Sequence, residues 1–136
     1  MQIPLNASVL AGLALPVLVA WTAAAAPAPP PPGVAAAFGN TVLSIYPDGR
    51  SQKIWLQPDG TWTGQGRAGQ PLAGQWRIQG AQVCLRQTRP PTLPLSLCRT
   101  FPADAHVGSS WSSRDVLGTP VQLKVVNGVT LNAGGS

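Results

Sequence analysis

The sequence predicts an all-β protein, a small antiparallel meander that forms a barrel or half-barrel with one disulfide. From position 41 onward, apolar and polar residues alternate in short segments, and no apolar stripe has helical spacing. Turn residues such as Asp-Gly and Asn-Gly separate these segments at intervals of about eight to twelve residues. Because each strand has one apolar face, the sheet has to curl or fold over to bury that face.

The composition limits the range of functions. The 136 residues include four Asp, no Glu, one His and two Cys, so few groups can carry acid–base, nucleophilic or metal chemistry. The net charge of +5 arises entirely after position 47, which makes the predicted folded part basic. We therefore expect a single domain that is not an enzyme, with no catalytic residues, no metal site and no cofactor.

Residues 1–25 are predicted to be a secretory signal peptide. Residues 9–26 carry no charge and end in small residues that offer an A-x-A cleavage site before Ala26. The alternative is an uncleaved anchor, because the first residues include no Lys or Arg and Pro16 interrupts the apolar run. We expect a periplasmic or secreted protein that meets a membrane only through an uncleaved signal.

A Pro- and Ala-rich linker is predicted at residues 26–37. Consecutive prolines favour an extended polyproline conformation, so this segment should act as a semi-rigid spacer. The β domain then occupies residues 38–131, and residues 132–136 form a disordered tail.

The first predicted strands are 41–46, with Leu43 and Ile45 on one face, and 51–57, with Ile54 and Leu56 on the inner face. Each is followed by a Pro-Asp-Gly sequence. Proline presets φ for a turn and Asp-Gly supplies the positive φ of a tight reversal. These turns mark successive hairpins.

The clearest strand is 72–79, where apolar residues alternate with polar ones and Trp76 is the expected core anchor. The strands expected after it, the last of them preceded by an Asn-Gly turn, are 82–88, 95–101, 121–125 and 129–131. The Ser-rich segment 111–115 fits either a strand or a loop.

Cys84 and Cys98 are expected to form a disulfide, as is usual for a cysteine pair in an exported chain. Leu85 and Leu97 lie on the apolar faces of their strands, so both cysteines face the other way. An antiparallel hairpin that places Leu85 opposite Leu97 also places Cys84 opposite Cys98. A redox-active pair is the weaker alternative, because a catalytic dithiol is usually C-x-x-C beside a helix.

The stretch 104–110 contains the residue types of a hydrolytic triad, namely Asp104, His106, Ser109 and Ser110. Triad members usually converge from separated parts of a chain, and no G-x-S-x-G sequence is present. We therefore reject a triad here. Asp104 and His106 would also supply at most two metal ligands.

A binding face is predicted on the polar side of the sheet. Its residues are Lys53, Trp55, Gln57, Gln75, Arg77, Arg86, Gln122 and Lys124. An exposed Trp55 could stack on a sugar ring, and the cations could pair with an anionic envelope polymer. The alternative is an ordinary solvated face on which an arginine or the N-terminal segment covers Trp55. Nucleic acid is not an expected partner, because the cations are scattered and export removes the usual ligand.

The motifs Asp59-Gly60, Gly74-Gln75-Trp76 and Val83-Cys84-Leu85 resemble those of small exported bacterial β-meander domains, over residues 41–101. This resemblance implies an exported β domain and carries over no active site. The expected function is non-enzymatic binding of an envelope glycan or of an exported protein. The competing hypothesis is a small periplasmic hydrolase or inhibitor-like factor.

Overall fold

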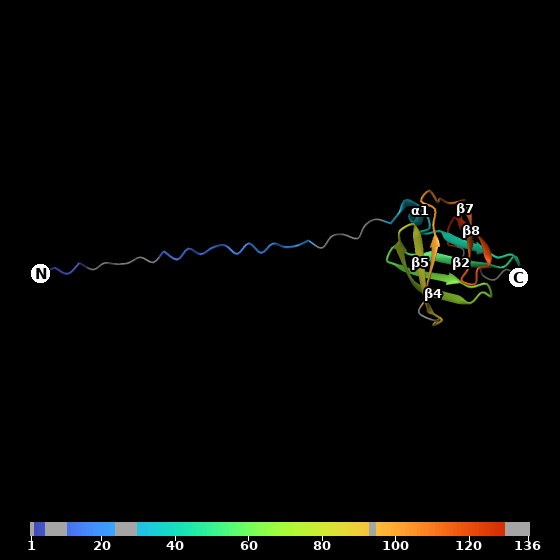
Figure 1. Cartoon of the computed structure of the whole chain (residues 1–136), viewed down its shortest axis with the longest axis horizontal. Helices are drawn as coiled ribbons and strands as arrows, with labels where there is room; N and C mark the ends of the chain where they lie inside the picture. Colours follow the sequence, from blue (N-terminus) through green and yellow to red (C-terminus); the bar gives the residue numbers. More distant parts are fainter. Residues whose placement is uncertain (1, 5–10, 24–29, 93–94, 130–136) are drawn as a thin grey trace.

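The computed structural model describes residues 2–4, 11–23, 30–92 and 95–129. Its elements are α1 (Pro32–Ala35), β1 (Thr41–Ile45), β2 (Ser51–Leu56), β3 (Thr61–Gln65), β4 (Pro71–Gln79), β5 (Gln82–Arg89), β6 (Ser96–Thr100), β7 (Ser110–Arg114) and β8 (Pro120–Val126). These described strands form a single antiparallel sheet in the order β6-β5-β4-β3-β2-β1-β8-β7. The sheet curls into a nearly closed barrel, so the predicted fold class is confirmed (Figure 1).

The two Pro-Asp-Gly sequences form the turns that join β1 to β2 and β2 to β3. Gly49 and Gly60 have φ values of 80° and 88°, a conformation that costs glycine little. In the first turn the Asp48 carboxylate accepts the Arg50 backbone N–H at 3.0 Å, and in the second the Asp59 carboxylate accepts that of Thr61 at 3.0 Å. Each aspartate thus stabilises its own reversal.

The interior of the barrel is built from alternate residues of each strand. Val42 lies opposite Ile54 on β2 and opposite Val125 on β8, which places all three on the inner face. Leu43 and Ile45 do share a face, as expected, but it is the outer one. The inner residues form two clusters, one around Trp62 and one around Tyr46, Val121 and Leu123.

Trp62 is the most deeply buried tryptophan among the described residues, with 3% of its surface exposed. It lies on β3, a strand that is not among those predicted from the alternation of apolar residues. A Cβ at Gly64 would lie 3.3 Å from the indole ring, and one at Gly74 would lie 2.6 Å from its nitrogen. Both glycines therefore leave room for the Trp62 ring. Trp76 does face inward, but it is half-buried and packs against the edge of the core beside Phe38.

The segment before the sheet differs from the predicted spacer. Pro32–Ala35 form the short helix α1, and Val34 and Ala37 are buried in the main core cluster. A Cβ at Gly33 would overlap the backbone carbonyl of Pro102, so the helix lies directly against the loop that follows β6. The end of the predicted linker is thus part of the folded domain.

Other predictions have mixed outcomes. Ser110–Arg114 form a strand, so the Ser-rich segment is a strand and not a loop. Residues 11–23 form neither helix nor strand and are exposed (Figure 1). The predicted cleavage site before Ala26, the tail 132–136 and most of the predicted strand 129–131 lie outside the described residues.

The predicted disulfide is confirmed. Cys84 and Cys98 are bonded and lie directly opposite each other on β5 and β6, with Leu85 opposite Leu97 in the same register. A disulfide is compatible with an oxidising, exported location. It joins an edge strand to the rest of the sheet.

Candidate functional site

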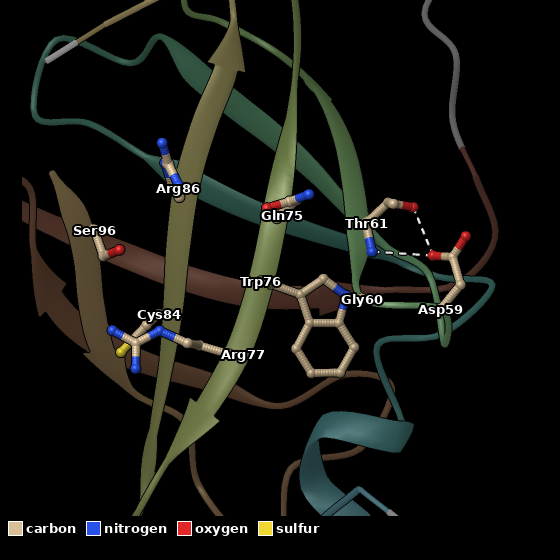
Figure 2. Close-up of a pocket in the computed structure, with 9 residues that line it drawn as sticks. All are labelled: Asp59, Gly60, Thr61, Gln75, Trp76, Arg77, Cys84, Arg86 and Ser96. Atoms are coloured by element: carbon tan, nitrogen blue, oxygen red, sulfur yellow. Dashed lines mark hydrogen bonds between the residues drawn. The ribbon is translucent and has the colours of Figure 1, made fainter. Parts of the chain in front are cut away.

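A shallow groove crosses the outer face of β3, β4, β5 and β6. We call it the arginine groove; it has a volume of about 660 Å³ (Figure 2). Its lining residues are Asp59, Gly60, Thr61, Gln75, Trp76, Arg77, Cys84, Arg86 and Ser96. Four strands at a spacing of about 4.8 Å give it a length of roughly 14 Å.

The strand register brings the polar side chains of the groove together. Gln75 on β4 lies opposite Arg86 on β5, and Arg86 lies opposite Ser96 on β6. Two residues further along the same two strands, Arg77 lies opposite Cys84 (Figure 2). Because Cys84 is bonded to Cys98, the disulfide holds two walls of the groove in a fixed register.

Charge is distributed unevenly along the arginine groove. Arg77 and Arg86 are exposed, and neither forms an ion pair within the described part of the chain. Asp59 lines the groove at the β2–β3 turn, where its carboxylate accepts the Thr61 hydroxyl at 2.6 Å (Figure 2). This hydrogen bond, together with that from the Thr61 backbone N–H, lowers the pKa of Asp59. The centre of the groove is thus cationic.

Trp55 lies on the outer face of β2, as predicted, but the expected exposure of its ring is wrong. Only 7% of its surface is exposed, and its Nε1 donates to the Thr41 hydroxyl at 2.9 Å. The Thr41 hydroxyl donates in turn to the carbonyl of Gly128, at 2.7 Å. The chain that follows β8 therefore passes over this face beside Trp55, and the ring is not available to stack on a sugar.

A second groove surrounds Trp55, with a volume of about 580 Å³. Gln57 lines it, together with Arg89 and Val129. Lys53, Gln122 and Lys124 line neither groove, although all three lie on the outer face. The structure thus divides the predicted binding face and gathers Gln75, Arg77 and Arg86 at one place.

Several groove residues were absent from the predicted face. Thr61 and Ser96 have short polar side chains, which do not by themselves indicate a binding face.

Arg99 on β6 lies outside the groove and was also not predicted. It stands between Leu97 and Phe101 in the alternating pattern, which places its side chain on the inner face. The alternation alone could have identified it as an unusual inward-facing cation.

The stretch 104–110 does not form a triad. His106 Nδ1 lies 3.0 Å from the Ser109 hydroxyl and 3.0 Å from the backbone carbonyl of Asp104, and it makes no hydrogen bond to the Asp104 carboxylate within the described segments. The Ser109 hydroxyl also accepts the His106 backbone N–H at 2.9 Å. These contacts stabilise an exposed turn. Within the described ranges, no group of three His, Cys, Asp or Glu side chains could hold a metal ion, and no helix is long and apolar enough to cross a bilayer.

Acid is expected to destabilise the turns. A side-chain hydrogen bond from Arg50 lowers the pKa of Asp48, and one from Thr61 lowers that of Asp59, from an ordinary value of 3.8. Groups with depressed pKa values stabilise the fold above their unfolded-state pKa, and this stabilisation disappears as the pH falls through the folded-state value. The midpoint of urea unfolding should be constant from neutral pH to about pH 5 and fall below pH 3.8.

The test is the same pH series on Asp59→Asn, with Asp104→Asn as the matched control, because the Asp104 carboxylate makes no such turn hydrogen bond to the described residues. Asp59→Asn should flatten the acid limb more than Asp104→Asn does. Equal slopes for both variants would contradict the assignment.

Comparison with known proteins adds no relative. No protein-family model matches the chain, and neither a curated protein nor a solved structure matches it.

Proposed function

We propose that this protein is an exported, non-enzymatic binding module that holds an anionic polymer of the cell envelope on the outer face of its sheet, with the arginine groove as the centre of contact. Carboxylate-bearing peptidoglycan is the polymer that we propose to test first. Arg77 and Arg86 would pair with its carboxylates, and Gln75 and Ser96 would hydrogen-bond to neighbouring polar groups.

The segregation of charge carries this proposal. The strand cations that face outward are Lys53, Arg77, Arg86, Arg89, Arg114 and Lys124. All four aspartates lie instead in turns or loops, and those at positions 48, 59 and 115 accept backbone hydrogen bonds there. The outer face of the strands therefore has positive charge without carboxylates, which favours an extended polyanion.

The burial of Trp55 favours one of the two binding modes that the sequence allows. A sugar-stacking platform needs an exposed ring, whereas Trp55 is covered and its indole nitrogen is already bonded. Pairing of guanidinium groups with carboxylates needs exposed arginines in a fixed arrangement. Arg77 and Arg86 are exposed on the paired strands β4 and β5, and the disulfide links β5 to β6.

The proposal predicts that Arg77→Gln/Arg86→Gln weakens binding to peptidoglycan about tenfold, since an exposed charged contact is worth up to about 1 kcal/mol. Lys53→Gln/Lys124→Gln removes the same charge outside the groove and should weaken binding less. The measurement is co-sedimentation of the oxidised protein with purified peptidoglycan at low and high salt, in parallel with peptidoglycan whose carboxylates have been amidated.

Retention that depends on the carboxylates and on the two arginines supports the proposal. Equal losses in both double variants would mean that net charge alone drives binding. No retention of the unmodified protein would overturn the polymer as ligand and leave an exported protein as the partner to seek.

A further inference from the structure

The barrel has a seam where β6 and β7 form the two edges of the sheet. No ladder joins these two strands among the described residues. At one end of the seam a ring contact connects them instead, because Phe101, just after β6, packs edge-on against Trp111 of β7 with ring centroids 4.9 Å apart. Side chains, not backbone hydrogen bonds, therefore close the barrel here.

Arg99 points into the barrel beside this seam. It lies opposite Val83, a buried inner residue of β5, and its side chain is half-buried. Its Nη1 atom is buried and has no hydrogen-bond partner. Burial lowers the pKa of the guanidinium, while Tyr46 and Asp115 act electrostatically in the opposite direction. Arg99 is thus a partly desolvated cation with one buried, unpartnered nitrogen.

Asp115 does not complete an ion pair with Arg99. Its Oδ1 accepts the backbone N–H groups of Leu117 at 2.9 Å and Thr119 at 2.8 Å, which hold the β7–β8 turn. The ion pair found in the described part of the chain joins Arg50 and Asp48 instead. The carboxylate that acts electrostatically on Arg99 thus has one of its oxygens engaged in this turn.

Trp111 supplies a second buried donor in the same region. Its Nε1 is buried without a hydrogen-bond partner, and its ring packs against the cluster that contains Tyr46. Tyr46 also acts electrostatically on Arg99, and Phe101, which touches Trp111, follows Arg99 by two residues on the same face. The two unpartnered donors thus share Tyr46 and Phe101 as neighbours.

We propose that the β6–β7 seam is a binding site for a single oxyanion group, a carboxylate or a phosphate, that accepts hydrogen bonds from Arg99 Nη1 and Trp111 Nε1. Buried donors are costly when unpaired, and a buried cation is more costly still. An oxyanion satisfies both donors and neutralises the charge, whereas a water molecule supplies acceptors without neutralising it. This site is separate from the arginine groove, which lies on the outer face of the sheet.

The test is a titration of the ¹⁵N-labelled protein with inorganic phosphate, and separately with acetate, at constant ionic strength set by sodium chloride. The Trp111 indole N–H resonance, identified with Trp111→Phe, should shift downfield and saturate. The ion that saturates at the lower concentration shows whether the site prefers a tetrahedral or a planar group. Arg99→Leu should abolish the saturable shift, and Arg114→Leu, which removes an exposed arginine on β7, should keep it.

Arg77→Gln/Arg86→Gln should also keep the shift, so failure of this site and failure of the polymer-binding proposal give different results. A Trp111 resonance that does not move, or that moves linearly with either ion, would overturn the seam site. An identical saturable shift in Arg99→Leu would also overturn it. If Arg99→Leu does not fold, Arg99→Lys replaces it, with an expected loss of affinity of about tenfold, because Lys lacks the guanidinium fork.

Discussion

Replacement of Trp62 by alanine is expected to lower the free energy of unfolding by about 3–5 kcal/mol, the usual cost of removing a fully buried Trp. The ring is the largest side chain of the main core cluster and has 3% of its surface exposed. Its Nε1 also donates to the carbonyl of Gln75 at 3.1 Å. Because Gly64 and Gly74 have no side chains that could move into the space, the cavity would persist.

The measurement is urea unfolding followed by circular dichroism. Trp76→Ala is the matched control. Trp76 is half-buried beside Phe38 at the edge of the same cluster, so its loss should cost less than that of Trp62. Equal or reversed effects would show that the core is centred on Trp76 instead.

The choice between these two tryptophans shows what alternation can predict. Leu72, Gly74, Trp76 and Ile78 follow one another on the inner face, and the pattern identified this face correctly. How deeply an inward-facing side chain is buried depends on which other segments cover each end of the barrel. Local alternation does not show this. In Thr61–Gln65 the inner positions hold only Trp62 and Gly64, so the strand has no aliphatic alternation and was missed.

Trp55 shows the same limit on the outer face. Alternation placed it on the correct side of β2, next to Lys53 and Gln57. Its burial depends on two long-range hydrogen bonds. One joins Trp55 to Thr41, 14 residues earlier, and the other joins Thr41 to Gly128, 87 residues later. Such long-range contacts are not visible in a local pattern, and so the ring was expected to be exposed.

The structure differs from the predicted extended linker for a related reason. Repeated proline predicts an extended chain, but a proline in the first turn of a helix is also favourable, because the N–H it lacks would have no partner there. Pro32 takes that role in α1, and burial of Val34 then fixes the helix against the barrel. Tertiary packing, which the local composition does not show, decided between the two conformations.

Removal of the disulfide by Cys84→Ser/Cys98→Ser is expected to lower the free energy of unfolding by about 3 kcal/mol, the chain-entropy value for a loop of about 15 residues. The register explains why the pairing could be predicted: each cysteine adjoins a leucine on the opposite face, and one hairpin register satisfies both pairs. Urea unfolding of the oxidised protein, the reduced protein and the double variant measures the effect. Reductant should destabilise the unmodified protein and leave the double variant unchanged.

The loss should also be local. β6 is an edge strand that pairs only with β5 among the described strands, so the disulfide is its one covalent brace. Backbone amides of β6 should exchange with solvent much faster in the double variant, while those of the central strands β2 and β3 keep relatively high protection. Uniform loss of protection would mean that the disulfide acts through the unfolded state alone, without the local contribution at β6. Selective loss at β6 would mean that the disulfide also holds one wall of both the arginine groove and the seam, so that reduction should weaken ligand binding at the two proposed sites before the barrel unfolds.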